Sequence, residues 1–129
     1  MNKKLQDSYE SIVDELSLEE VKSFKIGITN SLEEREEQYL SEGYSQVYPL
    51  ATGNNANIIQ AESDLIKELL SDNRVNSKCK NKSTVPGLGQ TQSAGILYVA
   101  VYVQLGNPIS SLDIHLKNIL FASGFPIKL

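Results

Sequence analysis

The most constraining feature of this sequence is an alternating apolar segment at residues 95–105. One side of the segment is aliphatic and consists of Leu97, Val99, Val101 and Val103. The other side consists of Tyr98, Ala100 and Tyr102. Alternation of this kind is typical of a β-strand, and the Asn107-Pro108 pair that follows breaks it. The chain is therefore predicted to contain a sheet that includes this segment.

Two more strands and four helices complete the prediction. Residues 23–29 and 45–52 have strand character, although Pro49 weakens the second because it cannot donate to a ladder. Apolar stripes and capping residues predict helices at residues 3–16, 31–40, 57–71 and 110–123, and a further helical turn starting at Ser17. This mixture favours an α+β fold with a small, mainly antiparallel three-stranded sheet flanked by helices.

The chain length of 129 residues corresponds to a single domain. We expect residues 1–21 to form an N-terminal helical extension, residues 22–105 the core, and residues 106–129 a C-terminal helix. No apolar run reaches the roughly 18 residues of a membrane helix, and the N-terminus lacks the apolar stretch of a signal peptide.

Cysteine and histidine are too scarce to build a structural zinc site. Cys79 is the one cysteine and His115 the one histidine, and we expect His115 to be a partly buried core residue. A single thiol also fits a reducing compartment, so a cytoplasmic location is predicted and no membrane partner is expected. Any catalytic metal would have to bind oxygen ligands.

The net charge of −4 is unevenly distributed along the chain. Residues 1–45 carry 11 acidic and 5 basic side chains, whereas residues 46–129 carry 5 acidic and 7 basic side chains. Residues 73–83 contain basic side chains and no acidic ones: Arg74, Lys78, Lys80 and Lys82. Such a loop can contact phosphates despite the negative total, because screening limits electrostatic reach to about 10 Å. A solvated loop without a partner is an equally good interpretation.

Glu62 is out of place on the predicted helix at residues 57–71. It lies in the middle of the apolar stripe formed by Ile58, Ile59, Leu65, Ile66 and Leu69. A carboxylate buried there must be paired, protonated or bound to a cation, because an isolated buried charge is costly. Glu62 is therefore either a functional ligand or half of a buried salt bridge, for example with Arg35.

Arg35 shares one face of the helix at residues 31–40 with Leu32 and Tyr39. Five glutamates surround this arginine in the sequence, so an exposed arginine paired with them at helical spacing is a simple alternative to a functional role. Periodicity alone favours that alternative.

The stretch KIGITNSLEEREEQY resembles the second half of the motif that defines GIY-YIG nucleases. In that family a strand ending in Tyr/Lys-Ile/Val-Gly-x-Thr is followed by a turn and a helix that carries an essential arginine. Here Lys25 precedes Arg35 by ten residues, and Tyr39 follows four residues later. The stretch AESDLIKELL is similar to the family's glutamate helix, which places the family's metal ligand at Glu62. Asn76 matches an asparagine found after that helix.

The resemblance implies metal-assisted hydrolysis of phosphodiester bonds. Glu62 would hold Mg²⁺ or Mn²⁺, which favour carboxylate oxygen. Arg35 would stabilise charge on the phosphate, and Tyr39 would orient the phosphate or a water molecule. Lys25 would stand where many members have a tyrosine. The loop residues Arg74, Asn76, Lys78, Lys80 and Lys82 would contact the nucleic acid.

One part of the family pattern is missing. The tyrosine usually assigned as the general base should lie on a strand about ten residues before Lys25, where this chain has Asp14-Glu15-Leu16-Ser17. The segment at residues 95–98, Gly-Ile-Leu-Tyr, is similar to the missing strand. Our hypothesis is that residues 95–104 pair beside residues 23–29 and present Tyr98 or Tyr102 to the cleft. The alternative is that both are ordinary half-buried strand tyrosines.

Three classes of function follow. The first is a small metal-dependent endonuclease that acts on DNA. It could work as a homodimer, because the chain has little room for a separate DNA-reading domain. The second is a module that keeps the nuclease scaffold and binds nucleic acid or a phosphate-bearing ligand without hydrolysis. The third is a protein-interaction domain, which the acidic N-terminal third favours.

Overall fold

The computed structural model describes residues 1–81, 95–104, 121 and 124–129. The elements follow the order α1 (Lys3–Leu16), β1 (Val21–Thr29), α2 (Leu32–Ser41), β2 (Gln46–Thr52), α3 (Asn55–Ser71), the short 3-10 helix η1 (Asn76–Lys78), β3 (Ile96–Val103) and β4 (Ile127–Lys128). The prediction of an α+β fold is confirmed. Lys82 and His115 lie outside the described residues, and so does most of the predicted helix at residues 110–123.

The described strands form one sheet in the order β1-β3-β2-β4. Strand β3 pairs antiparallel with both β1 and β2, and β4 pairs parallel with β2. The predicted antiparallel three-stranded sheet is therefore confirmed for the long strands, and β4 adds a parallel fourth member. Beyond the predicted helix at residues 110–123, Ile127 and Lys128 form a short strand that bonds to β2, which the sequence did not predict.

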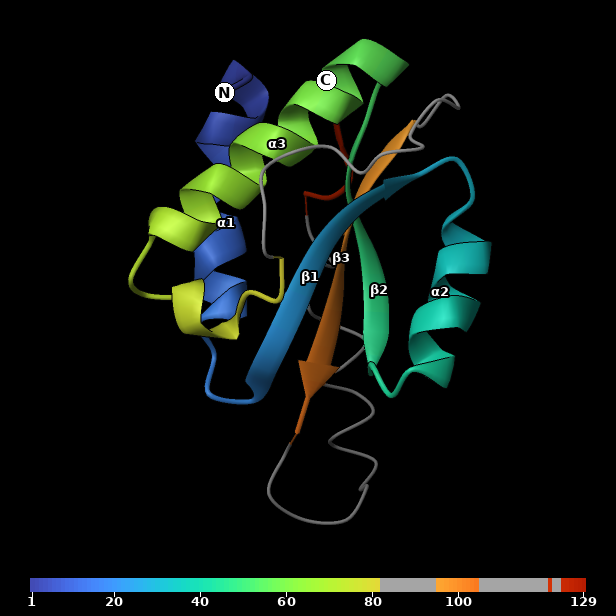
Figure 1. Cartoon of the computed structure of the whole chain (residues 1–129). Helices are drawn as coiled ribbons and strands as arrows, with labels where there is room; N and C mark the ends of the chain where they lie inside the picture. The colour runs from blue at the N-terminus through green and yellow to red at the C-terminus, as the bar shows by residue number, and fades with distance from the viewer. Residues whose placement is uncertain (82–94, 105–120, 122–123) are drawn as a thin grey trace.

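Helices cover both faces of the sheet. Figure 1 shows α1 and α3 side by side on one side of the sheet and α2 on the other. The aliphatic side of β3 packs in the main core with α1 and α3, as its alternation predicts. Its other side contributes Tyr98 and Ala100 to a smaller cluster with Tyr39 of α2 and Val47 of β2. Within the described residues, no helix is long and apolar enough to span a membrane.

Local capping explains where two helices begin. The Ser31 side chain accepts a hydrogen bond from Glu34 N, and the Asn54 side chain accepts one from Asn57 N. The helical turn predicted at Ser17 does not form. Ser17 instead ends α1, with its N–H donating to Val13 O at 2.8 Å, and the chain turns directly into β1.

Candidate functional site

Tyr98 lies directly across from Gly27 in the antiparallel pairing of β3 with β1. The predicted pairing of residues 95–104 beside residues 23–29 is thus confirmed. The Tyr98 ring crosses Gly27, because a Cβ built on Gly27 would overlap the ring and its hydroxyl. Gly27 is required here for space. The consequence is a tyrosine laid across β1, with only 3% of its surface exposed.

Helix α2 brings Tyr39 to the same place. The Tyr98 hydroxyl donates a hydrogen bond to the Tyr39 hydroxyl at 3.2 Å, and the two ring centroids lie 5.8 Å apart at 63°. Tyr44 packs edge-on against Tyr39, with ring centroids 5.1 Å apart. The two hydroxyls therefore form a buried pair in which Tyr98 is the donor.

Burial raises the pKa of Tyr98 far above its ordinary value, and the hydrogen bond to Tyr39 raises it further. The Arg35 guanidinium opposes this rise in the Tyr98 pKa, and the Glu62 carboxylate adds to it. Arg35 and Glu62 thus both lie within electrostatic reach of the Tyr98 hydroxyl. Tyr98 stays protonated at neutral pH, so it acts as a hydrogen-bond donor and is poorly suited to be a general base.

Glu62 is buried on α3, with 8% of its surface exposed. No hydrogen bond or ion pair joins its carboxylate to another residue in the described part of the chain, and burial raises its pKa. The salt bridge with Arg35 that the sequence allowed does not form, since α2 and α3 lie on opposite sides of the sheet, and Arg35 Nη1 donates to Gln38 Oε1 at 2.7 Å. The side chain is largely buried, although its carboxylate oxygens are not completely enclosed, and the loss of solvent disfavours its charged form unless it is protonated or bound to a cation.

Lys25 lies on β1 opposite Ala100 and shares the α2 side of the sheet with Gly27. Four elements thus supply the five residues predicted for the catalytic and metal roles. Strand β1 supplies Lys25, α2 supplies Arg35 and Tyr39, α3 supplies Glu62 and β3 supplies Tyr98. A hydrogen bond joins Tyr39 to Tyr98, and the charges of Arg35 and Glu62 both affect the pKa of Tyr98, although α2 and α3 lie on opposite sides of the sheet; Lys25 is half-buried on β1.

The donor set fits one hard cation with few protein ligands. Among the residues that the structure describes, no group of three or more His, Cys, Asp or Glu side chains could enclose a metal. Mg²⁺ commonly binds through one or two carboxylates and completes its shell with water and substrate phosphate. A buried carboxylate without a partner, such as Glu62, meets that requirement.

Asn81 is a positioning residue that sequence reasoning missed. Its side-chain Oδ1 accepts from Ile26 N at 2.8 Å, and its Nδ2 donates to Ile26 O at 2.9 Å. Lys80 N also donates to Phe24 O at 2.8 Å, so residues 79–81 line the free edge of β1. Because Ile26 lies between Lys25 and Gly27, this contact fixes the strand where it meets the site. Nothing in the local sequence distinguishes this asparagine from its neighbours.

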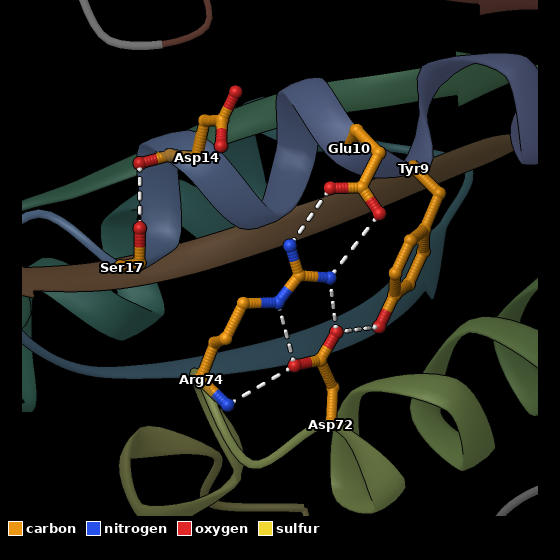
Figure 2. Close-up of polar contacts among 6 residues, drawn as sticks. All are labelled: Tyr9, Glu10, Asp14, Ser17, Asp72 and Arg74. Carbon is orange, nitrogen blue, oxygen red and sulfur yellow. Dashed lines mark hydrogen bonds and ion pairs between the residues drawn. The ribbon is translucent and has the colours of Figure 1, made fainter.

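The predicted nucleic-acid contacts divide into structural and exposed groups. Figure 2 shows Arg74 held between Asp72 and Glu10, with N–O distances of 2.7 and 2.8 Å, while Tyr9 donates to Asp72. These contacts join α1 to the end of α3. The depression beside them is also lined by Glu68, so carboxylates accompany the guanidinium there and disfavour a phosphate.

The remaining predicted loop residues differ in their surroundings. The Lys78 ammonium donates to Leu16 O and Leu18 O, which satisfies carbonyls where α1 ends. Asn76 opens η1 and is exposed, and Lys80 is exposed beside β1. Among the predicted lysines that the structure describes, Lys80 is therefore the one that remains available to a ligand near the site.

Comparisons of the chain with protein-family models, with curated proteins and with solved structures find no match. A functional assignment therefore depends on the chemistry of the site itself. In place of the upstream strand of the GIY-YIG pattern, residues 3–16 form α1, and β3 occupies the position beside β1.

Proposed function

We propose that this chain is a divalent-metal-dependent endonuclease of the GIY-YIG type that hydrolyses phosphodiester bonds in nucleic acid, with DNA the expected substrate. One observation carries the proposal. The buried Glu62 carboxylate has no partner among the described residues, yet it acts on the same Tyr98 hydroxyl as the Arg35 guanidinium. A lone carboxylate and a cation around a hydrogen-bonded tyrosine pair is a poor way to stabilise a core, and a suitable way to hold a metal and a phosphate.

Arg35 would bind the scissile phosphate. One of its N–H groups donates to Gln38, and a guanidinium has five N–H donors, so others are free to contact phosphate oxygens. Its fixed positive charge would stabilise the negative charge that builds on those oxygens during hydrolysis.

Tyr39 would orient the phosphate or the attacking water. Its oxygen accepts the Tyr98 proton, which leaves its own hydroxyl hydrogen free to donate to a ligand. Tyr98 fixes the direction of that donor, and Gly27 leaves the room that Tyr98 occupies. Glu62 would hold Mg²⁺ or Mn²⁺, and the bound ion would supply Lewis-acid polarisation of the phosphodiester.

A binding module without hydrolysis is the second candidate. The raised pKa of Tyr98 and the helix in place of the upstream strand both favour it, because they leave the described site without an evident general base. Such a module would use Lys25, Arg35 and Tyr39 to hold a phosphate-bearing ligand.

Plasmid cleavage and metal binding together test the proposal. Wild-type protein in Mn²⁺ or Mg²⁺ should nick a plasmid, and Glu62→Gln and Arg35→Ala should lower the rate to background. Glu68→Gln is the matched control, because Glu68 is an exposed carboxylate of the same helix. Millimolar Mn²⁺ should also raise the melting temperature of the wild type, and it should not do so for Glu62→Gln.

The outcomes separate the candidates. Cleavage that survives Glu62→Gln would contradict the proposed role of this residue. Binding of nucleic acid without turnover in any metal would favour the binding module. Neither binding nor cleavage would leave the protein-interaction class.

A further inference from the structure

In the part of the chain that the structure describes, helix α2 leaves the sheet face next to the candidate site partly open. Helix α2 packs mainly on β2 and β3, and the beginning of β1 lies opposite the end of β3. Tyr102 pairs with Ser23 there, on the same side of the sheet as Tyr98 and Lys25. All six tyrosines of the chain lie in the described part, and Tyr102 is the most exposed of them, with 37% of its surface accessible. The Tyr102 ring is thus partly presented to solvent beside the bulge of β1.

Three lysines lie on or beside the part of β1 that pairs with Tyr102. Lys25 lies two residues after Ser23 on β1, and Lys22 lies in the bulge just before Ser23. Lys80 is exposed beside the outer edge of β1, where its N–H bonds to Phe24 O. None of these three ammonium groups forms an ion pair within the residues that the structure describes.

We propose that this face, formed by Tyr102 with Lys22, Lys25 and Lys80, binds single-stranded nucleic acid and leads it to the site. The inference rests on the proposed function, because it takes nucleic acid as the ligand. An exposed tyrosine stacks on an unpaired base, and nearby lysines contact the backbone phosphates. Bases in a duplex are already stacked on each other, so they are not available to the Tyr102 ring.

The face leads toward the proposed catalytic residues. Tyr102 and Tyr98 lie four residues apart on the same side of β3, which corresponds to about 13 Å along the strand. Lys25 lies between their levels, opposite Ala100. A strand stacked on Tyr102 would therefore pass Lys25 before it reaches the Tyr98–Tyr39 pair.

Fluorescence anisotropy in EDTA tests the inference without any hydrolysis. Labelled oligothymidine, oligouridine and a duplex of equal length are titrated with the full chain. Wild-type protein should bind the single strands more tightly than the duplex. Tyr102→Thr, which keeps a β-branched residue in the strand, should weaken single-strand binding about ten-fold, and Tyr102→Phe should retain it.

Salt dependence tests the lysines. Lys22→Gln and Lys80→Gln should each reduce the slope of log affinity against log salt by about 0.7. Lys67→Gln is the control, because Lys67 is exposed on α3 and outside the face. Tighter binding of oligothymidine or of oligouridine identifies DNA or RNA as the preferred strand, and either supports the inference.

Two results would overturn it: a Tyr102→Thr variant that folds and binds single strands as the wild type does, or a duplex bound more tightly than either single strand. This failure is distinguishable from failure of the proposed function. Single-strand binding in EDTA without cleavage in Mn²⁺ supports the face and contradicts the enzyme. Plasmid cleavage that depends on Glu62, in a protein that does not bind single strands, supports the enzyme and contradicts the proposed binding face.

Discussion

Replacing Gly27 by alanine is the most direct test of the geometry at the site. The added methyl group would overlap the Tyr98 ring and hydroxyl, and even the third-nearest atom, ring Cε2, would lie 2.9 Å away. Tyr98 cannot swing aside freely, because it is buried between α2 and the sheet. The ring must therefore shift and break its hydrogen bond to Tyr39.

The size of the effect follows from three contributions. Overpacking a well-packed core costs about 1–3 kcal/mol. Loss of the buried hydrogen bond between Tyr98 and Tyr39 costs about 1 kcal/mol more. The smaller unfolded-state entropy of alanine offsets about 0.4–1 kcal/mol, because Gly27 does not have a positive φ. We expect Gly27→Ala to destabilise the fold by about 2 kcal/mol, or roughly 8 °C in melting temperature.

Urea unfolding of a double-mutant cycle measures this coupling. Tyr98→Val removes the ring and keeps a residue suited to a strand. In that background Gly27→Ala should be neutral or slightly stabilising, which gives a coupling energy of about 2–3 kcal/mol. Gly95→Ala is the control, because a Cβ there would lie 3.6 Å from Gly53 O, an ordinary contact.

Additive effects would refute the reasoning. If Gly27→Ala destabilised the Tyr98→Val protein as much as the wild type, the cost would come from the backbone at Gly27. If Gly27→Ala were as stable as Gly95→Ala, Tyr98 would not lie across β1 in solution.

Three further predictions concern buried and paired polar groups. Burial raises the pKa of Glu62 in the folded protein above the value of 4.5 in the unfolded chain. Without metal, the contribution of this residue to wild-type stability is therefore greatest below pH 4.5 and is lost as the pH rises through the folded-state pKa. Urea unfolding between pH 4 and 8 should show that Glu62→Gln is more stable than the wild type at neutral pH. Asn81→Ala should lower the free energy of unfolding in guanidinium chloride by about 1–3 kcal/mol, because Ile26 N–H loses its acceptor. The hydrogen bond from Arg74 lowers the pKa of Asp72, so Asp72→Asn should reduce the melting temperature at neutral pH, and the difference from wild type should shrink as pH falls below about 4.

Local patterns predicted the elements well where local forces form them. The alternation at residues 95–105 identified β3 and both of its faces, and the Ser31 cap identified the beginning of α2. The same capping pattern failed at Ser17, where the end of α1 uses the serine instead. The four-residue capping pattern is the same whether the serine begins a new helix or ends the preceding one. The pattern alone therefore cannot distinguish Ser31 from Ser17.

The nucleic-acid loop shows the limit of counting charges along a sequence. Arg74 and Lys78 carry the same charge as Lys80, yet the first two bind groups of α1 or α3 and the third remains exposed. Their partners are as many as 64 positions away in the chain. Only the folded arrangement decides which basic side chains form intramolecular contacts and which stay exposed to solvent.

The sequence by itself determined the period of each strand and helix, and so it determined that Glu62 would point into the core and that Tyr98 and Tyr102 would share one side of a strand. These are local properties, because side-chain direction follows from backbone repeat alone. The tertiary structure decided that Tyr98 lies across Gly27, that Asn81 fixes β1, and that Tyr102 is the most exposed of the tyrosines. Those outcomes depend on the order of the strands in the sheet and on how much of the sheet α2 covers. Both depend on how the whole chain buries its apolar surface, which no local pattern specifies.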